Sequence, residues 1–191
     1  KTTFANIIAH EMNAAIRVTS GPALAKQGDI MGLLSNVNTG DIVFIDEIHR
    51  LNSAVEEFIY PAMEDFKVDF TVDSGLHAKT INFPLKRFTL IGATTRAGLL
   101  SSPLRSRFGM LYHLEYYKVD ELAEIVNRSA DMLGLKGSQE AIRLIAARSR
   151  RTPRIANRLL KRVRDYAQVK GSGELTTEIV NKSLEMERID S

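Results

Sequence analysis

The sequence predicts an α/β domain over residues 1–117, followed by a small all-helical domain over residues 118–188. In the first part, short apolar runs alternate with segments of helical periodicity, and two of the runs have no polar face. Strands of that kind are typical of a parallel sheet that helices cover on both sides. After Tyr117 the apolar residues recur only at helical spacing, and no strand-like run remains.

Strands and helices alternate along the first domain, with helices expected at 3–14 and 52–64 and strands at 16–19, 42–46 and 88–93. Two further segments of alternating polarity flank Asp73-Ser74-Gly75, between the second helix and the last strand. Turn residues between alternating segments are typical of a β-hairpin, so we expect a hairpin to be inserted into the α/β unit.

The helices of the second domain are expected at 120–133, 139–149, 153–169 and 176–187. Glycines and the pair Thr152-Pro153 separate them. Proline suits the first turn of a helix, because the N–H that it lacks would have no partner there. This domain is therefore interpreted as a small helical bundle.

Composition limits the class of protein. The 191 residues are 44% hydrophobic, which is enough for one full domain and a second small one. The lack of cysteine excludes a disulfide framework and thiolate metal sites, and fits a cytoplasmic protein. No apolar run approaches the roughly 20 residues that cross a bilayer, so no membrane partner is expected. The chain begins at Lys1 rather than methionine and is interpreted as a fragment.

The net charge of +3 is unevenly distributed, and the basic excess lies after residue 115. Basic side chains follow one another there with no acid before Asp165, at Arg148, Arg150, Arg151, Arg154, Arg158, Lys161, Arg162 and Arg164. Such a run can hold phosphate from a nucleotide or a nucleic-acid backbone, or it can form a solvated helix face.

The stretch DIVFIDEIHR at 41–50 passes from four apolar residues to two adjacent carboxylates, Asp46 and Glu47, whose charges repel. A strand that ends at the surface in solvated acids is one interpretation. A nucleotide site is the other, because Lys1-Thr2-Thr3 leads into a helical pattern as the tail of a phosphate-binding loop does. Magnesium would relieve the repulsion, with Asp46 orienting its water shell and Glu47 polarising the attacking water. The two motifs together favour nucleotide hydrolysis.

Four stretches resemble the RuvB family of Holliday-junction branch-migration motors: KTT, DIVFIDEIHRLN, FTLIGATTRAGLLSSPLRSRFG and RTPRIANRLLKRVRDYA. The resemblance covers essentially the whole chain, and the last two stretches are particular to the family. It implies a P-loop ATPase large domain of the AAA-plus class, then a helical lid domain. It also implies an ATP hydrolase that moves Holliday junctions in DNA recombination and repair, acting as a hexameric ring. The Gly-rich loop would precede Lys1, and a winged-helix domain would follow the chain.

The resemblance implies roles for residues that bind ATP and Mg²⁺: Lys1 on the phosphates, Thr2 on magnesium, Thr3 against the nucleotide, Asp46 beside the metal and Glu47 on the attacking water. Thr95 matches the first sensor, a polar group that touches the γ-phosphate or the attacking water. An ordinary strand-end hydroxyl is the alternative for Thr95.

Further roles implied by the resemblance concern residues nearer the lid. Arg107 matches the arginine finger that enters a neighbouring subunit, with Arg105 as the local alternative. Arg154 matches the second sensor. Tyr117 matches a residue that lines the adenine, although a packed hinge residue is also possible there. Glu64-Asp65-Phe66 matches a segment whose backbone lies near nucleotide.

The resemblance also implies partners. The hairpin tip, with Leu76, His77 and Ala78, would dock onto the junction-binding partner RuvA, while duplex arms of the junction and a resolvase of the same pathway would be further partners. The tip departs from the family's more usual Gly-Pro-Ala-Ala. Arg151 also replaces a glycine that is common before Thr-Pro-Arg, which could change how Arg154 approaches the nucleotide.

His49 follows the acid pair, but the four histidines are scattered singly and show no metal-ligand spacing. We interpret His49 as supporting the site or contacting a neighbouring subunit. Two other functions stay open: a fragment that assembles with partners without hydrolysing ATP, and a clamp-loader-type ATPase. The stretch GATTRAGLLSSPLRSRFG argues against the clamp loader.

Overall fold

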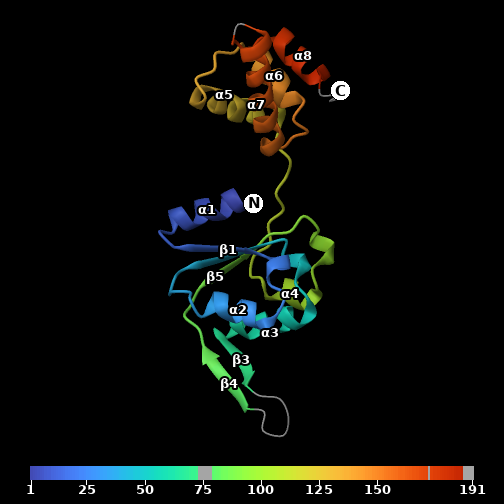
Figure 1. Cartoon of the computed structure of the whole chain (residues 1–191). Helices are drawn as coiled ribbons and strands as arrows, with labels where there is room; N and C mark the ends of the chain where they lie inside the picture. The colour runs from blue at the N-terminus through green and yellow to red at the C-terminus, as the bar shows by residue number, and fades with distance from the viewer. Residues whose placement is uncertain (73–78, 172, 187–191) are drawn as a thin grey trace. The chain divides into compact units, whose positions relative to one another are not determined.

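The structure is a computed structural model that describes residues 1–72, 79–171 and 173–186. The chain divides into two units, Lys1–Leu111 and Tyr112–Ser191 (Figure 1). Each unit has its own hydrophobic core. The first unit combines a parallel sheet with helices, whereas the elements described in the second are helices. The expected fold class is confirmed.

A parallel sheet forms the centre of the first unit, with strands in the order β1 (Ile16–Ser20), β2 (Ile42–Asp46) and β5 (Thr89–Gly92). Ile42 of β2 lies opposite Ile16 on one side and Thr89 on the other. The apolar residues of β2 are all buried, as expected for a central strand between two covered faces. Because the strands run in the same direction, their carboxyl ends meet at one edge of the sheet.

Helices cover both faces of this sheet: α1 (Thr2–Glu11) on one face, and α2 (Gln27–Leu34), α3 (Ser53–Glu64) and α4 (Ser102–Arg107) on the other (Figure 1). Successive side chains of β2 point to opposite faces of the sheet, so the strand packs against different helices on each face. Val43 and Ile45 belong to the larger cluster with the buried residues of α2 and α3, whereas Phe44 packs with Ala5 of α1. Helix α1 ends earlier than expected, and Asn13 has a left-handed φ of 49°.

The sequence prediction omitted α2 and α4, although both carry local signals. In α2, Ile30 and Leu34 are four residues apart and buried, and the Asp29 carboxylate accepts the N–H groups that precede the helix. In α4, the Ser101 hydroxyl accepts the Leu104 N–H at 3.1 Å. Serine at an N-cap with proline in the first turn is a helix-start signal.

The expected hairpin consists of β3 (Lys67–Val72) and β4 (Lys79–Pro84), which pair antiparallel from Lys67 opposite Pro84 to Val72 opposite Lys79. Its stem exposes a partly apolar surface at Phe70, Ile81 and Phe83. The tip predicted at Leu76, His77 and Ala78 lies outside the described residues.

The second unit contains the helices α5 (Val119–Met132), α6 (Gln139–Ala147), α7 (Pro153–Lys170) and α8 (Thr177–Met186). Helix α7 begins at Pro153, as predicted. Its buried residues recur at helical spacing at Ala156, Leu159, Leu160, Val163 and Ala167. Arg154, Arg158 and Lys161 are exposed. Within residues 1–72, 79–171 and 173–186, no helix combines the length and apolar character needed to cross a membrane.

We expect Gly21→Ala to destabilise the first unit, because a Cβ at Gly21 would lie 2.4 Å from the Glu47 carbonyl oxygen. Overpacking against backbone typically costs about 1–3 kcal/mol. Gly32, within α2, is the matched control, since nothing lies within 4 Å of its added Cβ. Gly32→Ala should stabilise by about 0.5–1 kcal/mol, as alanine favours helix. Urea unfolding of the full-length variants tests this, and equal midpoints for the two variants would contradict it.

Candidate active site

The acid pair lies where β2 ends and the chain turns. Asp46 is the last residue of β2, and Glu47 adopts the left-handed region at φ 51°, ψ 42° before the short helix η2 (Ile48–Arg50). The Glu47 N–H donates to Asp46 Oδ1 at 3.0 Å, and the Ile48 N–H donates to the Ala93 carbonyl at 3.0 Å. These bonds fix the turn on both sides of Glu47. The Glu47 side chain is 35% exposed and is accessible to a ligand.

The neighbouring strand brings threonines to the same edge. The Ala93 N–H donates to the Ile45 carbonyl at 2.9 Å, which continues the ladder beyond the last residue of β5. Thr94 and Thr95 follow, and the Thr95 hydroxyl donates to Glu47 Oε1 at 3.3 Å. The structure therefore brings the predicted first sensor and the predicted water-activating acid into contact.

Lys1 reaches this edge from the start of α1. Its ammonium donates to the Thr94 carbonyl, and α1 packs Ala5 against Phe44 and Ala93. Lys1, Thr2 and Thr3 are exposed. A helix N-terminus presents unpaired N–H groups and a partial positive charge, so this end of α1 favours anions such as phosphate.

Arg107, at the end of α4, is held by residues of α3. Its Nε lies 3.1 Å from Glu64 Oε1, and its Cζ lies 4.1 Å from the centre of the Tyr60 ring. Its Nη1 also donates to the Pro103 carbonyl at 2.9 Å. Arg105 is exposed, and its side chain has no hydrogen bond or ion pair within the part of the chain that the structure describes.

Tyr60 belongs to a network that joins α3 and α4. Burial, followed by a weaker contribution from Glu56, raises the pKa of the Tyr60 phenol, although its hydrogen-bond contact with Ser101 and the Arg107 charge act in the opposite direction. The protonated hydroxyl donates to Glu56 Oε1 at 2.8 Å, and the Ser101 hydroxyl donates to the same oxygen. The sequence reasoning did not include Tyr60, which lies one helical turn before Glu64.

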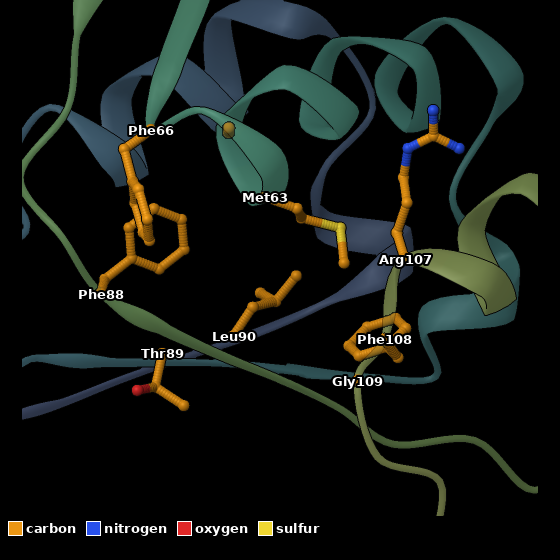
Figure 2. Close-up of a pocket in the computed structure, with 9 residues that line it drawn as sticks. Met63, Phe66, Phe88, Thr89, Leu90, Arg107, Phe108 and Gly109 are labelled. Atoms are coloured by element: carbon orange, nitrogen blue, oxygen red, sulfur yellow. The ribbon is translucent and has the colours of Figure 1, made fainter.

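The segment Glu64-Asp65-Phe66 makes contacts within its own unit. Glu64 pairs with Arg107, and Asp65 Oδ2 lies 3.0 Å from Lys67 Nζ and raises the pKa of that amine. Phe66 packs edge-on against Phe88, with ring centres 5.8 Å apart, and both line a pocket of about 250 Å³. Figure 2 shows the Arg107 guanidinium pointing away from these rings. The predicted backbone contact of this segment with nucleotide stays a prediction.

The two lid residues lie in the second unit. Arg154 is exposed in the first turn of α7, and Tyr117 is 43% exposed. The Tyr117 N–H donates to the Arg151 carbonyl, and Arg151 Nε donates to the Tyr117 carbonyl, both at 3.3 Å. Arg151 has a left-handed φ of 59°, which glycine adopts at little cost. The glycine that the resemblance leads us to expect before Thr-Pro-Arg would suit this backbone conformation. Arg151 adopts the same conformation at a cost in backbone strain.

His49 and Thr94 form contacts that the sequence did not indicate. His49 Nδ1 lies 2.8 Å from Thr94 Oγ1, and its Nε2 lies 3.6 Å from Glu47 Oε2. The side chain of His49 is only 6% exposed. Its position after the acid pair was the sequence signal that pointed to His49. The interpretation of His49 as a supporting residue is consistent with these contacts.

A parallel sheet with a lysine at the N-terminus of a covering helix, and with an acid pair at the end of the central strand on the same sheet edge, is the arrangement of a P-loop ATPase. Family models then identify the branch of that class. Residues 1–114 match the Holliday junction DNA helicase RuvB P-loop domain, and residues 117–190 match the RuvB AAA lid domain. The chain belongs to the RuvB family.

Known relatives agree with this assignment. The chain is 54% identical, over 191 residues, to the Holliday junction branch migration complex subunit RuvB of Myxococcus xanthus (strain DK1622), covering 100% of this chain and 56% of that protein. It matches the Thermotoga maritima RuvB Holliday junction branch migration motor with a TM-score of 0.87 and 50% identity, over 99% of this chain and 58% of that one. A single-residue mutant of the Thermotoga protein matches with a TM-score of 0.90 and 50% identity, over 99% and 59% of the two chains. The chain thus spans somewhat more than half the length of these relatives.

We expect Tyr60 and Arg107 to be energetically coupled, because a guanidinium 4.1 Å from an aromatic ring centre is in cation–π range. A double-mutant cycle of Tyr60→Leu with Arg107→Ala should give a coupling free energy of about 0.5–1 kcal/mol. The same cycle with Arg105→Ala is the control and should give a coupling near zero. Chemical unfolding of the full-length variants measures both cycles. Equal coupling in the two cycles would show that the ring does not hold Arg107.

Proposed function

We propose that this chain is the ATPase core of a motor that hydrolyses ATP and drives branch migration of Holliday junctions in DNA recombination and repair. The hydrogen bond between Thr95 and Glu47, at the edge where Lys1 contacts Thr94, carries this proposal. A sensor hydroxyl, a water-activating acid and a phosphate-binding ammonium are the parts that ATP hydrolysis requires. The names of the Myxococcus and Thermotoga relatives support the Holliday junction as the target.

The residues at the sheet edge fit ATP with Mg²⁺. Lys1 would bind the phosphates, with Thr3 against the nucleotide, while Thr2 and Asp46 would hold the metal. Mg²⁺ is usually bound through one or two protein groups together with substrate phosphates. The described residues contain no cluster of three histidine, aspartate or glutamate side chains that could hold a metal. When bound, the ion would neutralise charge on the β- and γ-phosphates.

Glu47 would act as a general base: its carboxylate would accept a hydrogen bond from the attacking water, take up its proton and so raise its nucleophilicity. Thr95, 3.3 Å from Glu47 Oε1, limits rotation of the carboxylate and can also meet the γ-phosphate. Arg107 would stabilise negative charge on the transferring phosphoryl group of a neighbouring subunit. Arg154 and Tyr117 would contact the nucleotide from the lid, and the backbone of residues 64–66 would lie near nucleotide.

The assembly and partners follow from family membership and remain part of the proposal. The chain would act in a hexameric ring in the cytoplasm, on the duplex arms of a junction and together with a resolvase. A RuvA-like protein would dock at the hairpin around Leu76–Ala78, and the exposed stem residues Phe70, Ile81 and Phe83 support an apolar docking surface there. Membership of the RuvB family argues against the clamp-loader alternative.

Glu47→Gln in the full-length protein should retain ATP binding but slow hydrolysis by about 100-fold or more, because the amide cannot act as a base. Glu57→Gln is the matched control, since Glu57 is an exposed glutamate on α3. Asp46→Asn should also weaken the dependence on magnesium. ATP affinity and turnover are measured separately, and unchanged turnover in Glu47→Gln would remove this acid from the proposed chemistry.

Arg107 should act in trans. An arginine finger contributes about 10³ to 10⁵ in rate, so Arg107→Ala should nearly abolish hydrolysis and leave nucleotide affinity mostly intact. Lys1→Ala subunits should also be inactive. When the two full-length variants are mixed at fixed total concentration, an intact Lys1 site can face an intact Arg107 across an interface, and phosphate release should partly recover. Absence of recovery, in mixed rings shown to have formed, would contradict a finger supplied in trans.

A further inference from the structure

We propose that His49 is a positioning residue that holds the Glu47 carboxylate for hydrolysis and links it to the Thr94 segment. The proposal rests on the ATPase function proposed above and assigns to that site a residue with no direct contact to substrate. His49 lies in η2, two residues after Glu47, yet its side chain is only 6% exposed. Its two ring nitrogens face different functional strand ends, with Nδ1 toward Thr94 and Nε2 toward Glu47.

The hydrogen bonds of Thr94 are compatible with a ring proton on Nε2 of His49. Thr94 Oγ1 accepts the Arg96 N–H at 2.9 Å, so its own O–H is available to donate to His49 Nδ1, 2.8 Å away. The ring proton then lies on Nε2, which is 3.6 Å from Glu47 Oε2. A small rotation of the Glu47 side chain would bring the two atoms within hydrogen-bond distance, with the imidazole as donor and the carboxylate as acceptor.

The two oxygens of Glu47 therefore have different partners. Thr95 donates to Oε1 from the end of β5, and His49 approaches Oε2 from η2. A free glutamate side chain samples several rotamers, and it must be restricted to one of them before it can align a water molecule. A hydrogen bond at Oε1 and an imidazole 3.6 Å from Oε2 restrict that freedom in advance, which is how a preorganised site lowers the barrier.

Thr94 extends this connection to the phosphate-binding end of the site. Its carbonyl accepts the Lys1 ammonium, while its hydroxyl contacts the imidazole. One residue thus contacts both Lys1 and His49, and His49 lies beside Glu47. Displacement of Thr94 would change the phosphate-binding and the water-activating groups together.

Two substitutions separate the contacts of the ring. In His49→Gln the amide nitrogen occupies the approximate position of Nε2, so the donor toward Glu47 is retained and the Thr94 contact is lost. In His49→Asn the amide occupies the approximate position of Nδ1, so the Thr94 contact is retained and the donor toward Glu47 is lost. His49→Leu keeps bulk and loses both. Arg50→Gln is the control, because Arg50 is the next residue and is exposed.

We expect His49→Asn and His49→Leu to lower kcat for ATP hydrolysis by about 10- to 100-fold in the full-length protein, as for a misplaced catalytic group. Affinity for a fluorescent ATP analogue should change by less than about threefold, and His49→Gln should keep most of the wild-type rate. A purely structural role would instead lower the thermal midpoint and the affinity of all three variants together.

The outcomes distinguish this proposal from the function on which it rests. Wild-type turnover in Asn and Leu variants that retain ATP binding would overturn the role of His49, while a strong defect in Glu47→Gln would leave the ATPase proposal intact. Equal kcat losses in the Gln and Asn variants, both with wild-type thermal midpoints, would also overturn it. Absence of ATP hydrolysis by the assembled wild-type protein would overturn the proposed function itself. If the Leu variant does not fold, the Gln and Asn pair still decides.

Discussion

Two backbone hydrogen bonds of Ala93, one to β2 and one from η2, hold the candidate site together. The Ala93 N–H donates to the Ile45 carbonyl at 2.9 Å, and the Ala93 carbonyl accepts the Ile48 N–H at 3.0 Å. Glu47 lies between these anchored residues with a left-handed φ of 51°. That conformation costs a non-glycine residue roughly 1–2 kcal/mol, and the flanking bonds offset it. With this backbone conformation, the Glu47 carboxylate points toward the strand end that carries Thr95.

Small residues around this turn allow the elements to approach closely. Ala5 of α1 packs with Phe44 and Ala93, so the start of α1 comes near enough for Lys1 to reach Thr94. A Cβ on Gly92 would lie 2.8 Å from Ile48 Cδ1, beside the same turn. Interiors packed at this density transmit displacement rather than absorb it. The geometry of the acid pair therefore depends on packing as well as on hydrogen bonds.

Much of the fold was predictable because its signals are local. The bounds of the strand 42–46 agree with the prediction to the residue, since a run of four apolar residues followed by two acids clearly marks where a buried strand begins and ends. Helix α4 was omitted because it has only 6 residues and is too short to show periodicity. Contacts of His49 with Thr94, and of Tyr60 with Arg107, join residues 45 and 47 positions apart. Contacts between residues so far apart in the sequence arise from tertiary packing, which produces no periodic pattern in a single sequence.

The contacts of Arg107 also explain how acids can lie in a segment predicted to approach a nucleotide. An unpaired Glu64 or Asp65 would repel a triphosphate, yet Glu64 lies 3.1 Å from Arg107 Nε and Asp65 lies 3.0 Å from Lys67 Nζ. Each acid therefore forms an ion pair with a basic side chain, and the local charge is close to balanced. The same pairing orders the Arg107 side chain within its own unit. Since ordering a long side chain on association costs free energy, an arginine already held over Tyr60 would lose less on entering a neighbouring site, as proposed above.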